Sequence, residues 1–555
     1  MQKNNVHYIF VSGGVLSGLG KGLTTSSISL LLQQRGYKVV PIKSENYLNI
    51  DSGTINPIEH GDPFLCEDGL EADIDLGNYE RFLNKQMNYG NFITMGQIYK
   101  TIIDKERNMG YEGKTVDPIP HVPEEIIKRI KETAKSQNAE IVVIELGGTA
   151  GEYQNIFYYE AARMMKHREG DNVIHVHVSY VPVPNHIGEP KTKPTQLSVQ
   201  TLNSMGIQPD FIIARSEVEL DDLRKEKLAN SCYLDKRDII SNPNLQYIEE
   251  IPLELHSQNL DTRILDKLNL PHNKLDLTAW NKTLEDIKSV KNSEVTIAIV
   301  GKYFATGDHV LKDSYYALIE AINHASWKNH QKINFRWVNS EIHEKEMNEI
   351  LKGSDGIIVP IGWGSRGVEG KINAIQYARE NKIPYLGLCY GMQLATIEFA
   401  RNVVGLKDAN TTEVDPNTKY PIIHIIPQTS NYVKIKGENV SMRLGGYDCV
   451  LDKDSIVYSI YKKHNALKDA EKGVVSERHR HRYEFNNEYR EKLTNAGMKI
   501  VGTSPDNFFV EFIELPKETH PFFIATQAHP EYKSSPINPH PIFIEFLKAS
   551  EKSKK

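Results

Sequence analysis

The segment Leu386-Gly387-Leu388-Cys389-Tyr390-Gly391-Met392-Gln393 decides how the second half of this chain folds. The apolar run 383–388 before the cysteine predicts a short buried strand, and the apolar stretch 392–400 after it predicts a helix. A side chain on such a sharp turn is held out of the sheet, and the start of the following helix favours a thiolate. Small flanking residues let a substrate carbonyl approach the backbone. The pattern therefore predicts a nucleophilic cysteine at position 389.

The partners of this nucleophile lie far downstream, in His529-Pro530-Glu531. A cysteine nucleophile needs a base, and the base needs a carboxylate that fixes its tautomer. The alternative is that Cys389 is an ordinary buried cysteine. The joint occurrence of Gly-x-Cys-x-Gly, the apolar strand and His-Pro-Glu favours the nucleophile. This half of the chain resembles the class I glutamine amidotransferases, which release ammonia from glutamine through a thioester.

Composition limits the class of protein. The 555 residues are too many for one hydrophobic core, so two or three domains are expected. The net charge of -6 and the lack of a long basic tract make nucleic acid an unexpected partner. No apolar run approaches the ~20 residues of a membrane span, and the first residues lack the apolar stretch of a signal peptide. Four cysteines without framework spacing fit the reducing cytoplasm that a working thiolate requires.

Short β-branched runs alternate with helical segments in both halves of the chain, which predicts an α/β protein with two mainly parallel sheets flanked by helices. In the first half we expect strands at 7–11, 39–42, 141–144, 173–178 and 210–214, and helices at 24–34, 123–136 (with Pro123 at the first helical position) and 152–166. The second series of strands is expected at 295–301, 356–359 and 385–388. We therefore predict a first domain at 1–270, a polar linker at 271–293 with one helix around 280–287, and a second domain at 294–550.

A glycine-rich loop follows the first expected strand, in Ser12-Gly13-Gly14-Val15-Leu16-Ser17-Gly18-Leu19-Gly20-Lys21-Gly22. Such a loop lets backbone N–H groups converge on phosphate oxygens, and Lys21 adds a full positive charge. The loop departs from a Walker A sequence, because Val15 stands where a glycine is required and Gly22 stands where Ser or Thr is required. Magnesium ligands must then come from elsewhere. The alternative is a tight turn without a ligand.

Two acidic residues are candidates for those ligands. Asp75 lies in the acidic stretch 71–77, and Glu145 ends an apolar strand, as a Walker B carboxylate does. Asp73, in the same acidic stretch, is interpreted as a solvated loop carboxylate. A further element, Gly188-Glu189-Pro190-Lys191-Thr192-Lys193-Pro194-Thr195-Gln196, could hold a second polyphosphate, although by itself it could also be a surface loop.

Together these segments closely resemble the CTP synthase family, in the same order from about residue 6 to residue 548. The segments that carry the resemblance are the glycine-rich loop, Asp51-Ser52-Gly53-Thr54, His60-Gly61, Glu67-Asp68-Gly69, 75–82, Lys191-Thr192-Lys193-Pro194-Thr195-Gln196, Arg366-Gly367-Val368-Glu369-Gly370, Met442-Arg443-Leu444-Gly445, Glu477-Arg478-His479-Arg480-His481-Arg482-Tyr483 and His529-Pro530-Glu531.

The resemblance implies conversion of UTP to CTP with ATP, Mg2+ and glutamine, by a P-loop-like or Rossmann-like synthetase domain and a class I glutamine amidotransferase domain. It implies an ATP site at Ser17, Gly18, Leu19, Gly20, Lys21, Gly22, Lys43 and Asp75, with Asp75 and Glu145 as magnesium ligands. It implies a UTP or CTP site at Ser17, Lys191, Thr192, Lys193, Gln196 and Lys227. It implies catalysis by Cys389, His529 and Glu531, and a glutamine site at Gly362, Gln393, Glu413 and Arg482. His60 matches a position at the ammonia passage.

In the family, GTP activates glutamine hydrolysis, CTP competes with UTP, and four subunits assemble; the resemblance implies the same here.

Four departures from the family pattern concern the glutamine site and the ammonia passage. Ile361 replaces the first glycine of the oxyanion strand, Tyr390 replaces a leucine after the cysteine, and Pro63 replaces a small aliphatic residue of the passage. The lid segment 427–440 is short, which bears on GTP activation. If the oxyanion strand requires positive φ at position 361, isoleucine there is strained. On that basis we predict that the chain uses glutamine poorly relative to ammonia.

Two other interpretations remain at this stage. One is a different amidoligase that activates a carboxylate of a cofactor precursor, against which the lysine-rich loop 191–196 argues. The other is a regulatory homologue that binds nucleotides and assembles, which Ile361 favours.

Overall fold

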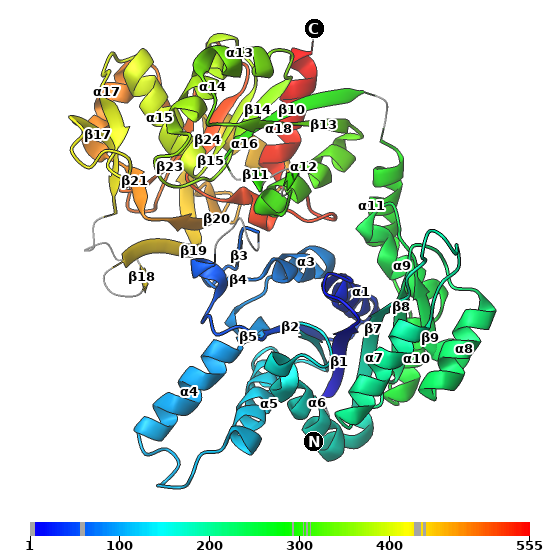
Figure 1. Cartoon of the computed structure of the whole chain (residues 1–555). Coiled ribbons are helices and arrows are strands. Elements are labelled where there is room, and N and C mark those ends of the chain that lie inside the picture. Colours follow the sequence, from blue (N-terminus) through cyan, green and yellow to red (C-terminus); the bar gives the residue numbers. More distant parts are fainter. Residues whose placement is uncertain are drawn as a thin grey trace. The chain divides into compact units, whose positions relative to one another are not determined.

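The computed structural model describes residues 6–55, 61–290, 293–302, 305–306, 309–310, 312–426, 434–436 and 440–554 (Figure 1). Within these residues the chain forms two compact units. The first comprises Met1–Thr54 and Asp75–Leu284, and the second comprises Ile55–Ile74 and Glu285–Lys555. Each unit is an α/β structure built on its own sheet, as the alternation of strands and helices predicts.

The first unit contains a seven-stranded sheet in the order β5-β2-β6-β1-β7-β8-β9. Every strand pair is parallel, and the strands are almost entirely buried, as expected for continuous β-branched runs between two helical layers. The strands are β1 His7–Gly14, β2 Val39–Glu45, β5 Phe92–Thr94, β6 Ile141–Leu146, β7 Val173–Tyr180, β8 Phe211–Arg215 and β9 Ile239–Asn242.

Helices cover both faces of this sheet (Figure 1). Helices α4, α5 and α6 pack into one hydrophobic cluster with β1, β2 and β6. The helices of this unit are α1 Lys21–Gln34, α3 Ile74–Leu83, α4 Met95–Arg107, α5 Pro118–Ser136, α6 Ile156–Glu169, α7 Lys193–Ser204, α8 Asp222–Cys232, α9 Ile251–Ser257, α10 Leu260–Lys267 and α11 Thr278–Lys288.

The second unit contains a ten-stranded mixed sheet, β13-β10-β14-β15-β24-β23-β22-β19-β18, with β20 also paired to β19. Strands β13 to β24 in this order are parallel, and the remaining pairs are antiparallel. The parallel part corresponds to the predicted series, whereas the antiparallel extension was not predicted. The strands are β10 Glu294–Gly301, β13 Lys332–Asn339, β14 Gly356–Val359, β15 Tyr385–Leu388, β18 Lys434–Lys436, β19 Val440–Leu451, β20 Val474–His481, β22 Lys499–Thr503, β23 Val510–Glu514 and β24 Phe523–Thr526.

Helices and small sheets complete the second unit. The helices are α12 Tyr316–Asn329, α13 Glu344–Leu351, α14 Val368–Glu380, α15 Tyr390–Asn402, α16 Ile456–Lys463, α17 Arg490–Asn495 and α18 Pro541–Ser553. The small sheets contain β3 Phe64–Leu65 with β4 Glu71–Ala72, β11 Ala305–Thr306 with β12 His309–Val310, and β16 Ala409–Thr411, β17 Tyr420–Ile425 and β21 Tyr483–Phe485.

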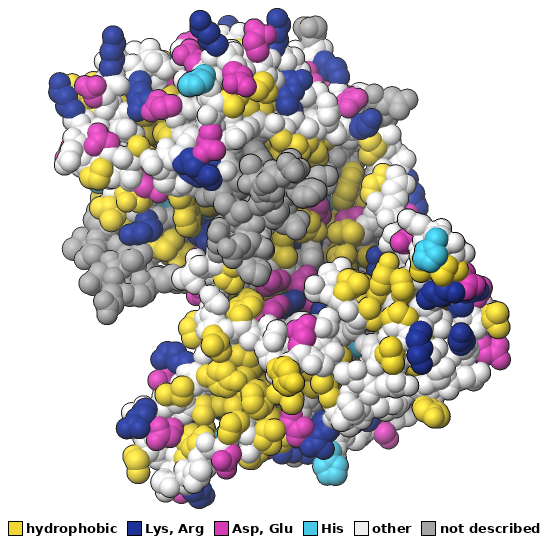
Figure 2. Space-filling view, in the orientation of Figure 1, with side chains coloured by type: hydrophobic (Ala, Val, Ile, Leu, Met, Phe, Trp, Pro, Cys, Tyr) yellow, Lys and Arg dark blue, Asp and Glu magenta, His cyan; other side chains and the backbone are white. Residues whose placement is uncertain are grey.

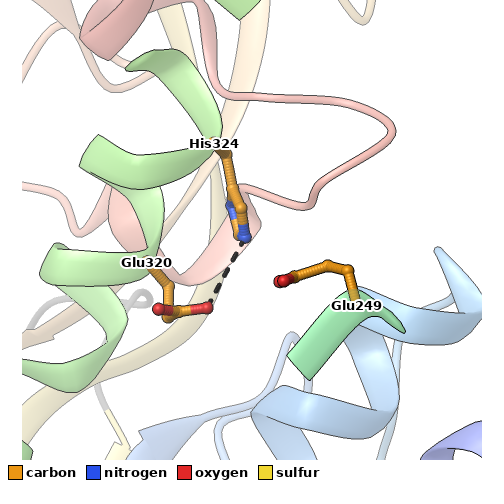
Figure 3. A group of neighbouring side chains, drawn as sticks. All are labelled: Glu249, Glu320 and His324. Carbon is orange, nitrogen blue, oxygen red and sulfur yellow. Dashed lines mark ion pairs between the residues drawn. The ribbon is translucent and has the colours of Figure 1, made fainter. Parts of the chain in front are cut away.

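Helix α12 is fixed against the turn that follows the last strand. On this helix, His324 Nε2 lies 3.8 Å from Glu320 Oε2 (Figure 3), and His324 Nδ1 shares a hydrogen bond of 3.1 Å with Ser534 Oγ. Ser534 directly follows the short 3-10 helix η9 Pro530–Lys533. These contacts hold the Pro-Glu part of His-Pro-Glu against a rigid helix.

The predicted strands are all present. The five predicted in the first unit end one to three residues later than expected, and β14 and β15 have the expected bounds. The helix starts differ more: α1 begins at Lys21 instead of residue 24, and α6 begins at Ile156 instead of residue 152. Pro123 lies inside α5 rather than at its first position, because the helix is broken at Ile119 (φ -113°, ψ 123°) and begins again directly after that residue. Pro123 therefore sits in the first turn of the continuous part, where backbone N–H groups lack intrahelical partners in any case. No helix among the described residues is long and apolar enough to cross a membrane.

A segment from the N-terminal half belongs to the second unit. Residues 61–74, here called the strap, form the β3–β4 hairpin and are held to β20 by buried ion pairs. Arg478 Nε lies 3.0 Å from Glu67, and Arg480 Nε lies 2.6 Å from Glu71. The compact units therefore differ from the predicted division at residue 270, which assigned the strap to the first domain.

Candidate functional site

Cys389 lies on a tight turn between β15 and α15, in the backbone conformation φ 50°, ψ -98°. This left-handed φ is strained for a residue with a side chain. The turn is possible because the neighbouring glycines have no Cβ: one added to Gly391 would lie 2.0 Å from the Val359 carbonyl oxygen, and one on Gly387 would lie 2.7 Å from the Tyr385 hydroxyl. This turn, here called the elbow, is the sharp strand-to-helix turn that the sequence predicts.

His529 and Glu531 lie close to this thiol. His529 Nδ1 is 2.7 Å from Glu531 Oε1, and both residues are buried. Burial alone would lower the pKa of His529, but the Glu531 carboxylate and Cys389 outweigh it and raise that pKa to about 10. An imidazolium stabilised by a carboxylate on one side and a sulfur on the other is the arrangement of a thiolate–imidazolium pair.

The described residues around the thiol leave one nitrogen of the His529 imidazole available for proton transfer. His529 Nε2 has no hydrogen-bond partner among them. The Gln527 amide donates to Cys389 Sγ at 3.5 Å. Hydrogen bonds between a nucleophile and its base are often long or poorly aligned before substrate binds.

The oxyanion strand follows β14 and contains the sequence Pro360-Ile361-Gly362-Trp363-Gly364. Ile361 is buried and does not adopt a positive φ; in this strand only Gly364 does, at 79°. The strain expected at Ile361 is therefore absent, because the strand does not require a left-handed conformation at that position. This removes the physical reason given above for poor use of glutamine.

The residues assigned to glutamine surround this strand and the elbow. The Gly364 N–H donates to Glu413 at 2.9 Å, and the Tyr390 hydroxyl donates to the Gly364 carbonyl at 3.3 Å. Gln393 donates to the Tyr483 carbonyl at 2.8 Å from a buried position, while Arg482 is exposed. Tyr390, the second departure from the family pattern, therefore stabilises the oxyanion strand through this hydrogen bond to Gly364.

The glycine-rich loop of the first unit contains an unusual residue. Val15, which stands where Walker A has glycine, adopts φ 79°, a conformation in which a β-branched residue is an outlier. Gly18 and Gly20 also have positive φ, at 75° and 85°. Lys21 folds back over Gly13, where an added Cβ would lie 2.8 Å from its side chain, and its ammonium donates to the Gly148 carbonyl at 2.8 Å.

Acidic side chains gather beside this loop around the ammonium of Lys43. Lys43 Nζ lies 2.6 Å from Asp75, 2.8 Å from Glu145 and 3.1 Å from Glu45. Burial alone would raise the pKa of Asp75, but Lys43 holds it below its usual value, while burial raises the pKa of Glu145 and Glu45. Convergent hard oxygens of this kind fit Mg2+.

Glu45 was not predicted from the sequence. It ends β2, and Glu145 lies near the end of β6, but Lys43 and Ser44 precede Glu45 and weaken its resemblance to a strand-end carboxylate. The Tyr79 hydroxyl donates to the second oxygen of Glu145 and so orients that carboxylate.

The departure at Gly22 has a steric cause. A Cβ on Gly22 would lie 2.1 Å from Asp75 Oδ1, so a side chain at this position excludes the observed placement of the carboxylate. The loop therefore has the Asp75 carboxylate where a Walker A loop has a hydroxyl.

The loop 188–196 leads into α7. Thr192 and Gln196 are buried and bonded to each other, with the Gln196 amide donating to the Thr192 hydroxyl at 3.2 Å. Lys193 and Lys227 are exposed, and Lys191 pairs with Glu189.

Helix α7 is tied to the glycine-rich loop by a buried chain of hydrogen bonds. Ser12 Oγ is 2.8 Å from His177 Nδ1, and His177 Nε2 is 2.8 Å from Ser198 Oγ. These hydrogen bonds therefore link the two candidate nucleotide-binding elements of the first unit, which are the glycine-rich loop and α7.

Two predicted features lie outside the described residues. These are His60 and, apart from residues 434–436 and 440, the lid segment 427–440. Pro63 is buried in the strap, and its carbonyl accepts a hydrogen bond of 3.1 Å from the Tyr532 hydroxyl.

Models of known protein families match both halves of the chain. The family model "CTP synthase N-terminus" matches residues 7–270, and "Glutamine amidotransferase class-I" matches residues 310–549. A CTP synthase of Caldanaerobacter subterraneus is 47% identical over 544 residues, covering 98% of each chain. One of Methanocaldococcus jannaschii is 47% identical over 551 residues, also covering 98% of each. The chain belongs to the CTP synthase family.

Among solved structures, the glutaminase domain of a Trypanosoma brucei CTPS with bound acivicin is 37% identical. The match covers 46% of this chain and 94% of that domain, with a TM-score of 0.40.

The steric conflict at Gly22 gives a first prediction. Gly22→Ser and Gly22→Ala should both lower CTP formation by at least about tenfold, with ammonia as well as with glutamine, because either side chain displaces Asp75. Steady-state rates with each nitrogen source measure this. If Ser retains activity that Ala loses, a hydroxyl at position 22 replaces the carboxylate and the steric explanation is wrong.

The second prediction concerns Ile361. Because its φ is not positive, Ile361→Gly should change the glutamine-dependent rate by less than about threefold and leave the ammonia-dependent rate unchanged. A large gain in the glutamine rate alone would show that isoleucine strains the strand during catalysis.

Proposed function

We propose that the chain catalyses the ATP-dependent amination of UTP to CTP, with ammonia released from glutamine. The observation that carries this proposal is the presence of two complementary sites in one chain. A Cys389–His529–Glu531 arrangement suits amide hydrolysis, and a glycine-rich loop beside clustered carboxylates suits phosphoryl transfer. Relatives named CTP synthase match nearly the whole chain.

The chemistry explains why both sites are needed. The oxygen on C4 of uracil is a poor leaving group, so ATP first transfers its γ-phosphoryl group to that oxygen. Ammonia then attacks C4 and inorganic phosphate leaves. Lys21, which lies over the glycine-rich loop, is placed to stabilise charge on the transferring phosphoryl group. Lys191, Lys193, Gln196 and Lys227 are proposed to bind UTP.

Glutamine hydrolysis proceeds at the elbow. The Cys389 thiolate attacks the γ-carbonyl carbon, and its oxygen becomes an oxyanion. His529, protonated and oriented by Glu531, gives its proton to the departing nitrogen as the C–N bond breaks. The neutral imidazole then takes a proton from water, which attacks the thioester and releases glutamate. Glu413, Gln393 and Arg482 are proposed to hold the substrate.

Mg2+ fits the carboxylate cluster of the first unit. Asp75 and Glu145 would hold it, with Glu45 within reach of the same Lys43 ammonium. When bound, the ion would neutralise charge on the ATP phosphates. Lys43 keeps the carboxylates together by charge, and Tyr79 orients Glu145.

Regulation and assembly are further parts of the proposal. We propose GTP as an activator of glutamine hydrolysis, CTP as a competitor of UTP, and a homotetramer. Figure 2 shows hydrophobic side chains on the visible face of the first unit, and Leu48, Ile103, Met109 and Ile119 are each more than half exposed. Exposed apolar groups of this kind suit subunit contacts. Cys232, Cys389 and Cys449 are free thiols, which suits the cytoplasm.

The regulatory-homologue interpretation rested on strain at Ile361, which the structure does not contain. The alternative amidoligase is tested by product analysis. CTP formed from UTP and ATP, with glutamine and then with ammonium, supports the proposal; amination of another carbonyl substrate in place of UTP would replace it.

A third prediction concerns the division of labour between the sites. Cys389→Ala should lower glutamine-dependent CTP formation by more than about 10³-fold, because the thioester cannot form, and should spare the ammonia-dependent reaction. Both rates are measured on the same preparation. Loss of both rates in a folded variant would contradict two separable sites.

A fourth prediction concerns the carboxylates. Asp75→Ala or Glu145→Ala should stop synthesis with either nitrogen source and leave glutamine hydrolysis at Cys389 measurable. Asp171→Ala is the matched control, because Asp171 is an exposed acid of the same unit, and it should keep at least about half of the wild-type rate. A normal rate of CTP formation in both of the first two variants would show that the ligands are misassigned.

A further inference from the structure

Lys371 is a fully buried lysine in the amidotransferase unit. It lies on α14 with 0% exposure, within the apolar stripe formed by Val368, Ile372 and Ile375. Among the described residues it makes no ion pair with an acidic side chain. Burial of an amine without a carboxylate partner is costly, so the position calls for a local explanation.

The amine of Lys371 holds the backbone of the oxyanion strand. Its Nζ donates to the Pro360 carbonyl at 3.0 Å and to the Ile361 carbonyl at 3.4 Å. The Ile361 carbonyl also accepts a hydrogen bond of 3.2 Å from the Tyr315 hydroxyl. Two consecutive peptide groups are therefore fixed through their oxygens.

Fixing these carbonyls also fixes the N–H groups of the same peptides. In a planar trans peptide the C=O and N–H bonds point in opposite directions. When the oxygens of residues 360 and 361 are directed at Lys371, the N–H groups of Ile361 and Gly362 are directed away from it. Within the described part of the chain, neither of these N–H groups donates to a protein acceptor.

The sheet places these N–H groups beside the nucleophile. Strands β14 and β15 are parallel, with Val359 opposite Gly387, so the segment with Ile361 that follows β14 and the turn with Cys389 that follows β15 leave the sheet at the same edge. Ile361 also lines a small cavity together with Glu531. The strand that Lys371 holds is therefore the strand adjacent to the reacting thiol.

We propose that Lys371 is a positioning residue for glutamine hydrolysis, which holds the oxyanion strand so that the Ile361 and Gly362 N–H groups can stabilise the oxyanion formed at Cys389. This inference deepens the proposed function and rests on it. Lys371 acts through the backbone and does not contact the substrate. It keeps the donors in place before substrate arrives, so no reorganisation is required when charge develops.

The packing around Lys371 is specific to this role. A Cβ on Gly362 would lie 2.6 Å from Lys371 Nζ, so only glycine at 362 leaves the amine its place. The Tyr390 ring lies 5.4 Å from the same nitrogen and closes the site from the side of α15. Burial lowers the pKa of Lys371 well below its usual value, but the amine and the ammonium both carry the two hydrogens that the carbonyls accept.

The test uses Lys371→Met in the full chain. Methionine keeps the length and burial of the side chain and removes its donors. Glutamine-dependent CTP formation should fall in kcat by about 10²–10³, the cost of a lost oxyanion-hole donor, with little change in KM for glutamine. Ammonia-dependent formation should stay within about twofold and reports that the variant is folded. Lys382→Met, which removes an exposed cation just after the same helix, is the matched control and should keep both rates.

Two thiol probes separate positioning from an effect on the thiolate. An aldehyde analogue of glutamine adds to Cys389 and forms an oxyanion-like adduct, so its binding should weaken together with kcat. Chloroacetamide alkylates the thiolate by displacement of chloride and forms no oxyanion, so its rate and pH profile should not change. If Lys371→Met does not fold, Tyr315→Phe removes one hydrogen bond from the Ile361 carbonyl and should give the same pattern at about fivefold.

Three results would overturn the proposal. They are an unchanged glutamine rate, an equal loss with both nitrogen sources in a folded variant, and a shifted alkylation profile with unchanged aldehyde binding. If Lys371→Met does not fold and Tyr315→Phe is tested instead, an unchanged glutamine rate in Tyr315→Phe would also overturn the proposal. A wild-type protein that uses ammonia but never glutamine would instead contradict the proposed glutaminase function, whatever the variants do.

Discussion

Close backbone approach at Cys389 is the constraint on which the amidotransferase site depends. Strand β14, strand β15 and helix α15 meet there, and the Val359 carbonyl lies where a side chain on Gly391 would be. Because two glycines remove this conflict, the cysteine is held at φ 50° with its thiol at the end of the sheet. The base, its carboxylate and the oxyanion strand are then arranged around a nucleophile that the backbone has already placed. The same effect occurs in the first unit, because Gly22 has no Cβ and so leaves room for the Asp75 carboxylate.

Buried charge organises the second unit around a segment that is distant in sequence. Arg478 and Arg480 of β20 hold Glu67 and Glu71 of the strap, and Asp62 receives hydrogen bonds from Arg480 at 3.2 Å and from Tyr532 at 3.1 Å. Tyr532 directly follows Glu531. Removal of one member of such a buried pair leaves an uncompensated charge, so the strap and β20 depend on each other. Residues that precede the first unit's α3 in sequence thus help to build the environment of the glutaminase site.

Several features of both sites could be read from the sequence because they depend on local pattern. The elbow, the His-Pro-Glu partners and the apolar strands each follow from residue type and spacing over a few positions. Glu45 and Lys371 were missed, although each carried a signal. Glu45 ends a strand, although Lys43 and Ser44 before it weaken that signal. Lys371 interrupts an apolar helical stripe. Strain at Ile361 was expected and is absent, because φ at a single loop position depends on the path of the neighbouring chain, which no local pattern contains.

The sequence by itself determined the α/β class, the family and the identity of the reactive groups, since these depend on periodicity and on short motifs. Only the tertiary structure decided which distant residues share a site. It placed the strap with the second unit, gathered Glu45, Asp75 and Glu145 around Lys43, and set Lys371 beneath the oxyanion strand. The strap is the clearest case, because its contacts join residues more than 400 positions apart, such as Glu71 and Arg480. Their energies arise from burial and charge pairing, which exist only after the chain has folded.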